Sequence, residues 1–180
     1  MVDRKEKLTK RECQVLAELI KSGRVSDQEI ARKLNTSRPT VLKIRRRLEQ
    51  KGVIKKYTCE VDWEKLGLNI HAAILYQWKD YSKSKELNSL VRFIKSQPEV
   101  ILFVKGEGIG SKTDLIISIH ESLDACERFI KRLKYQWRDN VENVEVFLSS
   151  IRGIFKNYDL SSPALCRIGK REDDKEEKQF

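Results

Sequence analysis

Apolar positions in the first fifty residues recur at helical spacing in three short runs. The first two runs begin with the capping boxes Thr9–Glu12 and Ser26–Glu29, in which a hydroxyl and a carboxylate each accept a backbone N–H of the first helical turn. The third run begins at Ser37 and ends before Gly52, and only the dipeptide Asn35–Thr36 separates it from the second. Three short helices with a tight turn before the third predict a helix-turn-helix.

A different pattern follows this helical part. The segment 53–59 is expected to be a strand that begins a β-element, the wing, beside the helices, and a helical turn over 62–67 is expected to join the two halves of the chain. The pattern then predicts a strand (69–78), a helix (85–96), two strands (100–105 and 115–120), a helix (124–137) and a last strand (144–151). This βαββαβ order is the ferredoxin-like arrangement, with both helices on one side of a four-stranded sheet. The expected fold class is therefore α+β, a winged helix-turn-helix followed by a ferredoxin-like domain.

The predicted sheet is apolar on both faces. A sheet that carries helices on one face only should alternate apolar and polar residues. Instead, Ile101–Val104 and Leu115–Ile117 are continuous apolar runs. An exposed apolar face is a partner site, and the simplest partner is a second copy of the chain. A homodimer also suits a helix-turn-helix, because two recognition helices can occupy two DNA half-sites.

Charge is distributed unevenly between the two halves. The chain carries a formal net charge of +10, and residues 1–57 hold 17 Lys and Arg against 7 Asp and Glu. The remaining residues hold 20 of each sign, so all of the excess positive charge lies in the first third. A basic module joined to a neutral one indicates a module that binds a polyanion, followed by a module with a different role.

The third helix concentrates this charge. Val41, Ile44 and Leu48 share the face that should pack inward. On the opposite face, Lys43 and Arg46 are best placed to reach base edges in the major groove of double-stranded DNA, whereas the arginines on its flanks are expected to hold phosphates. The predicted DNA-binding residues are Ser37, Arg38, Pro39, Thr40, Leu42, Lys43, Arg45, Arg46, Arg47 and Lys55.

Several classes of protein do not fit the sequence. No apolar run is long enough for a membrane span, and the first twelve residues lack the apolar core of a signal peptide, so we expect a cytoplasmic protein. The four cysteines lie at least forty residues apart and neither His71 nor His120 has a neighbour at ligand spacing, so we expect no metal and no cofactor. The glycine-rich loop 106–112 lacks the spacing of a P-loop and is either a hairpin connection or a small-ligand loop.

The stretch Leu48–Thr58, followed by Asp62 and then Leu66–Gly67, resembles the Lrp/AsnC (feast/famine) family of transcriptional regulators, in a form often seen in archaea. The resemblance covers about Thr9 to Lys156 and implies that the βαββαβ module is the family's RAM-type domain. It also implies dimers, often assembled further into tetramers or octamers, and an amino acid or related metabolite bound between C-terminal modules.

In this family the effector loop reads glycine, two residues, then aspartate. In this chain, Gly106–Glu107 and Thr113–Asp114 resemble the two ends of that loop. Seven residues lie between Gly106 and Asp114 instead of two. The candidate effector-binding residues are therefore Gly106, Glu107, Thr113 and Asp114.

We accordingly expect a helix-turn-helix domain over residues 1–61, a dimerisation and effector domain over 62–156, and a polar, flexible tail over 157–180. The expected function is sequence-specific regulation of transcription, without enzyme activity. Two alternatives stay open at this point. One is an enzyme similar to siroheme decarboxylases, which share this pairing of modules and would gather histidine and arginine in a C-terminal cleft. The other is a chromatin-like protein that coats DNA without sequence preference.

Overall fold

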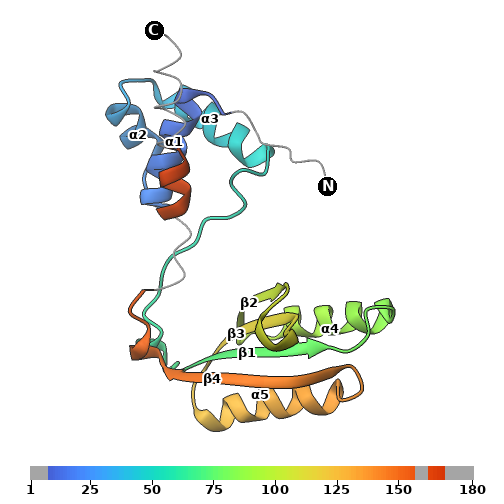
Figure 1. The fold of residues 1–180 in the computed structure, drawn as a ribbon. Helices are drawn as coiled ribbons and strands as arrows, with labels where there is room; N and C mark the ends of the chain where they lie inside the picture. Colours follow the sequence, from blue (N-terminus) through green and yellow to red (C-terminus); the bar gives the residue numbers. More distant parts are fainter. Residues whose placement is uncertain (1–7, 157–161, 169–180) are drawn as a thin grey trace. The chain divides into compact units, whose positions relative to one another are not determined.

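The computed structural model describes residues 8–156 and 162–168 (Figure 1). Contacts within the chain group these residues into two compact units. Residues 8–60 and 162–168 form the first, here called the helical unit, and residues 61–156 form the second, the sheet unit.

The helical unit contains the three expected helices, and their N-termini are capped as the sequence predicts. They are α1 (Lys10–Lys21), α2 (Asp27–Lys33) and α3 (Arg38–Gln50). The Thr9 hydroxyl accepts the N–H of Glu12 at 3.2 Å, and the Glu12 carboxylate accepts the N–H of Thr9 at 2.8 Å. Ser26 and Glu29 repeat this exchange at α2, and Ser37 caps α3. The core between the helices consists of Val15, Leu19, Ile30, Ala31 and Val41.

The strand predicted over residues 53–59 is wrong: the structure assigns neither helix nor strand to this segment. Gly52 adopts a φ of +66°, which turns the chain back, and the N–H groups of Val53 and Ile54 both donate to the Leu48 carbonyl, at 2.9 and 3.2 Å. The segment forms no ladder because the described part of the helical unit offers it no strand to pair with.

Residues 162–168 form a short helix that the sequence pattern did not predict. It belongs to the helical unit, where Ile168 is buried with 8% of its surface exposed. This helix lies within the segment expected to be a flexible tail; the rest of that expectation, for 157–161 and 169–180, falls outside the described residues.

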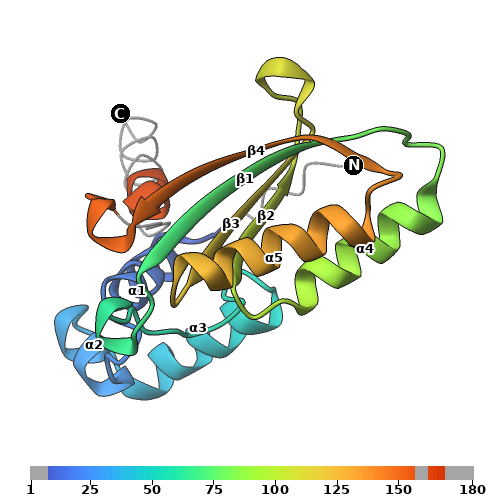
Figure 2. The ribbon, with the colours of Figure 1, turned by 90° about the horizontal axis from the view of Figure 1, so that it is seen from below.

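The sheet unit has the predicted βαββαβ order (Figures 1 and 2). Its elements are η1 (Glu64–Leu66), β1 (Ile70–Trp78), α4 (Ser84–Ser96), β2 (Val100–Lys105), η2 (Ile109–Ser111), β3 (Asp114–His120), α5 (Leu123–Gln136), β4 (Val141–Ser150) and η3 (Ile151–Gly153). The four strands are antiparallel to their neighbours in the order β2-β3-β1-β4. The ferredoxin-like prediction is therefore confirmed.

The start of β4 is the one clear error in the predicted strand boundaries. The sequence placed it at residue 144, but the strand begins at Val141, which pairs with Trp78. Asn143 adopts a φ of +50°, and the register shifts between Leu75 and Gln77 opposite it. This bulge interrupts the regular pattern of the strand, and the prediction had begun the strand only after it.

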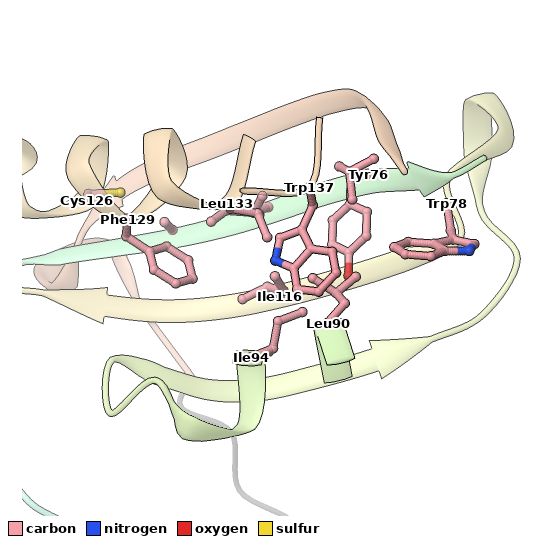
Figure 3. Packing of buried hydrophobic residues seen from close by; sticks show 12 residues of the cluster. Tyr76, Trp78, Leu90, Ile94, Ile116, Cys126, Phe129, Leu133 and Trp137 are labelled. Atoms are coloured by element: carbon pink, nitrogen blue, oxygen red, sulfur yellow. The ribbon is translucent and has the colours of Figure 1, made fainter. Parts of the chain in front are cut away.

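The core of the sheet unit lies between the sheet and its two helices (Figure 3). Tyr76 and Trp78 of β1 point into it together with Leu90 of α4 and Leu133 of α5, and all four are almost completely buried. Since β1 is a central strand, its alternate residues anchor both helices to the same face. The opposite face of the sheet carries no helix of this unit.

Candidate nucleic-acid interface

Helix α3 has one face in the core and one face in solvent. Val41 and Leu48 are completely buried, and Ile44 packs against the core of the helical unit. On the outer side, Lys43 and Arg46 are exposed. The inward face therefore fixes the orientation of α3, and the two residues predicted to read bases project away from the core.

Three cations of α3 have no partner in the described residues. They are Arg38, Lys43 and Arg46, for which the structure gives no ion pair or hydrogen bond with another described side chain. They share one helix, so their charges repel one another unless an anion lies between them. Leu42 is half-buried beside Lys43, and Pro39 is exposed in the first turn.

The N-terminus of α3 carries two of the other predicted contacts. The hydroxyls of Ser37 and Thr40 lie 2.8 Å apart, and the Ser37 hydroxyl accepts the N–H of Thr40 at 3.3 Å. Both residues are exposed. Their hydroxyls thus stabilise the cap and stay accessible at the positive end of the helix dipole, where anions bind favourably.

Arg45 does not belong with these cations, although the sequence placed it among the phosphate contacts. Its Nη2 lies 2.7 Å from Oδ1 of Asp27 on α2 and donates to the Val25 carbonyl at 3.1 Å. Its guanidinium also lies 5.7 Å from the centre of the Tyr57 ring. Only 18% of the Arg45 side chain is exposed, so this arginine holds parts of the helical unit together.

Arg47 is partly engaged in the same way. Its Nε lies 3.3 Å from Oε1 of the buried Glu12, although 59% of the arginine side chain is exposed. The backbone N–H of Thr9 donates to Glu12 and lowers the pKa of its carboxyl below the ordinary value, and the charge of Arg47 acts in the same direction. Lys55 lies beyond α3 in the irregular segment and is exposed.

The candidate effector residues lie at the two ends of the β2–β3 connection. The N–H of Gly106 donates to the Thr113 carbonyl at 2.8 Å, which closes the connection into a hairpin. Gly106 and Glu107 are exposed, whereas Asp114 is 3% exposed. The structure thus brings Gly106 and Thr113 together and leaves Glu107 exposed to solvent.

Asp114 lies in an unusual setting next to Tyr76, its register partner on β1. Its Oδ2 accepts the Thr113 hydroxyl at 2.6 Å, but Asp114 Oδ1 and the Tyr76 hydroxyl are buried with no hydrogen-bond partner. Burial raises the pKa of the Asp114 carboxyl, and burial followed by the nearby Asp114 charge raises the pKa of Tyr76. Two unsatisfied polar groups at the base of the loop are costly without a further polar partner.

The described residues meet the requirements of neither a metal site nor a membrane-spanning helix. No group of three or more His, Cys, Asp or Glu side chains in residues 8–156 and 162–168 is arranged to hold a metal ion. The four cysteines, all within the described ranges, form no disulfide with one another, and two of them are buried. In the same residues, no helix combines the length and hydropathy that crossing a bilayer requires.

Comparison with known proteins agrees with this arrangement. A family described as winged helix-turn-helix DNA-binding matches residues 8–55. The HTH-type transcriptional regulator LrpC of Bacillus subtilis is 33% identical over 129 residues, which cover 70% of this chain and 83% of LrpC. The solved structure of B. subtilis LrpC superimposes with a TM-score of 0.63 over 86% of this chain and 99% of that one, at 29% identity.

Two further structures share the fold. PH0061 of Pyrococcus horikoshii has a TM-score of 0.71 at 25% identity, covering 86% of this chain and 99% of that one. The Neisseria meningitidis regulator NMB0573, solved as a complex with L-Met, has a TM-score of 0.72 at 18% identity and covers 86% of this chain and 96% of that one. Because the chain matches LrpC along most of its length and has the same two modules in the same order, it belongs to the Lrp/AsnC family of DNA-binding transcriptional regulators.

Proposed function

We propose that α3 reads duplex DNA in the major groove through Lys43 and Arg46. The observation that carries this proposal is the division of the cations on α3. Arg45 and Arg47 are paired with carboxylates inside the helical unit, whereas Lys43 and Arg46 are exposed and without a partner in the described residues. An arginine at such a position can donate two hydrogen bonds to guanine O6 and N7, and Leu42 beside it can contact a thymine methyl group.

Arg38, Lys55 and the hydroxyls at the start of α3 are proposed to bind the phosphate backbone. Arg38 is exposed one residue after the N-cap, where the helix dipole also attracts an anion. Lys55 follows the C-terminal end of α3. Contacts at both ends of the recognition helix would fix its register along the groove without themselves reading sequence.

Sequence-specific regulation and non-specific coating of DNA predict different results in one experiment. We would select duplexes from a random pool with the full-length protein and then footprint the enriched sequence at moderate salt. A reader of base edges enriches a defined motif and protects a discrete window. Enrichment of no motif, with uniform protection that disappears as salt rises, would show that the helix binds phosphates only.

We propose that the working form is a homodimer, or a higher homo-oligomer built from it, joined through the open face of the sheet. Leu102 and Val104 of β2 pair with Ile117 and Leu115 on that face, and they are 37% and 42% exposed. Phe147 of β4 lies on the same face, opposite Ala73, and is 64% exposed. A second copy would cover these apolar side chains and would supply a second recognition helix.

A small-molecule effector, such as an amino acid, is proposed to act at the loop that begins with Gly106 and Glu107 and ends with Thr113 and Asp114. The unsatisfied oxygen of Asp114 and the neighbouring Tyr76 hydroxyl support a polar ligand or water there. The L-Met complex of the N. meningitidis regulator is the precedent for an amino acid in this fold.

The geometry of the sheet unit disfavours the enzyme alternative, and we propose that the protein has no catalytic activity of its own. His71 pairs with Ile119 and His120 with Ile70, so the two histidines, on adjacent central strands, face opposite sides of the sheet. Burial lowers the pKa of both imidazoles. Two histidines on opposite faces cannot act together on one substrate. We also propose that the protein works in the cytoplasm, because a DNA-binding regulator must reach the chromosome.

A further inference from the structure

A groove on the helical unit remains unexplained by DNA binding. It has a volume of about 620 Å³ and lies between α1, the segment after α3 and the helix over residues 162–168. This is within the range of pockets that hold small molecules. The helix that forms its third wall comes from a segment in which the sequence predicted no element.

The floor of the groove is apolar. Leu16 and Ile20 of α1 line it, one helical turn apart, and neither belongs to the core between the three helices. Ile54 lines it from the segment after α3, and Ala164 and Ile168 line it from the C-terminal helix. The C-terminal helix therefore forms one wall of the groove and leaves the groove open. Ala164 contributes only a small side chain to this wall.

The rim of the groove is cationic. Lys55, Lys56 and Arg167 line it, all three are exposed, and the lining includes no carboxylate. None of the three has an ion pair in the part of the chain that the structure describes. Elsewhere in the helical unit, cations such as Lys33, which lies 2.7 Å from Glu18, are neutralised by a neighbour.

We propose that this groove is a binding site for an amphipathic anion, an aliphatic chain that ends in a carboxylate. The chain would lie on the apolar floor, and the carboxylate would lie among the rim cations, whose mutual repulsion it would relieve. Of the rim cations only Lys55 is shared with the proposed phosphate contacts, and neither DNA binding nor the effector loop of the sheet unit accounts for the apolar floor or for Lys56 and Arg167 beside it.

The test uses the full-length protein and decanoate as the probe, followed by isothermal titration calorimetry. Decylamine, which has the same tail and the opposite charge, and hexanoate, which has the same head and a shorter tail, are the matched ligands. We expect decanoate to bind with one site per chain, hexanoate to bind more weakly, and decylamine not to bind. Because the readout does not involve DNA, its failure is separate from any failure of the proposed reading of DNA by α3.

Two variants probe the two halves of the site. K56Q/R167Q removes two rim charges and should weaken decanoate binding roughly five- to tenfold. A164F puts a much larger side chain on the apolar floor while keeping every charge, and it should weaken decanoate binding by about tenfold or more. R128Q/K134Q, with the same loss of charge on α5 of the sheet unit, should bind like the unaltered protein.

Three results would overturn the proposal. The first is no binding of decanoate at roughly millimolar concentration. The second is equal binding of decylamine, which would show that the charged rim plays no part. The third is decanoate binding that survives both K56Q/R167Q and A164F, which would place the ligand elsewhere.

Discussion

Arg45 of α3 and Asp27 of α2 form an ion pair with 2.7 Å between Nη2 and Oδ1, and more than four-fifths of each side chain is buried. A basic residue on the helix proposed to read DNA can therefore serve to hold the helical unit together. The same guanidinium covers the Tyr57 ring, and the Tyr57 hydroxyl donates to Glu49 at 2.8 Å. The pair thus links α2, α3 and the segment after α3.

Replacing Arg45 with alanine should destabilise the helical unit and leave the base preference of folded protein unchanged. Removing one member of this buried pair leaves the Asp27 carboxylate without its partner, so we expect a loss of about 1–3 kcal/mol in the free energy of unfolding. Urea unfolding of R45A, D27N and the double variant measures this coupling. If R45A unfolds like the unaltered protein but binds DNA more weakly, the arginine contacts phosphate after all.

Arg46 and Arg38 should differ in how they affect DNA binding. R46A should cost about 1–3 kcal/mol at one base pair of the selected site and relax the preference there. R38A should weaken binding to every sequence alike and reduce the slope of log affinity against log salt by about 0.9. Competition binding of both variants on the selected site and on single-base substitutions of it distinguishes the two roles. Equal losses on all sequences for R46A would mean that it holds phosphate.

Glu12 should make the helical unit sensitive to acid. Its pKa is held below the ordinary value of 4.5, mainly by the backbone N–H of Thr9, so folding favours the ionised form. A group whose pKa is lowered by folding stabilises the protein above its unfolded pKa, and that contribution disappears as the pH falls through the folded pKa.

We therefore expect the stability of the unaltered protein to fall more steeply than that of E12Q between about pH 5 and pH 3, whereas E12Q should be less stable near neutral pH. Urea midpoints over this range measure the effect. E86Q, which removes an exposed carboxylate on α4, is the control and should follow the unaltered protein. Parallel curves for E12Q and the unaltered protein would contradict the role of Glu12.

The sequence was sufficient for features that depend on near neighbours. The capping box at Thr9 and the buried face of α3 both involve residues three or four positions apart, which the helical repeat places together. The pairing of Arg45 with Asp27 depends instead on how α2 packs against α3. The spacing of residues along α3 gives no information about that packing. The sequence thus correctly predicted that α3 is rich in cations. It could not predict which of these cations pair within the helical unit and which remain exposed without a partner in the described residues.

The sequence of α1 contains a signal for the C-terminal helix. Leu16 and Ile20 lie four residues apart on α1 but do not share the core face of Val15 and Leu19. A second apolar stripe on a helix predicts a second partner. That Ile168 lines the same groove as this stripe could be found only from the fold, because nearly 150 residues separate the two segments.

Ile168 should be the main anchor of the C-terminal helix. A seven-residue helix is too short to persist by itself in water, so its order depends on the side chains it buries. I168A should cost about 2 kcal/mol or more and should raise hydrogen exchange in residues 162–168 far more than in α3. C166A, at an exposed position of the same helix, is the control. Unchanged exchange in I168A would mean that other contacts hold the helix.

Phe147 should decide whether the chain assembles. It is 64% exposed on the open face of the sheet, and burying a glutamate there against a second copy would be unfavourable. F147E should therefore shift the protein to a monomer in sedimentation experiments and weaken binding to a two-half-site duplex more than to a single half-site. Y135E is the matched control, because Tyr135 is 78% exposed on α5, and α5 covers the other face. Dissociation by Y135E with an intact F147E oligomer would place the interface on the helices.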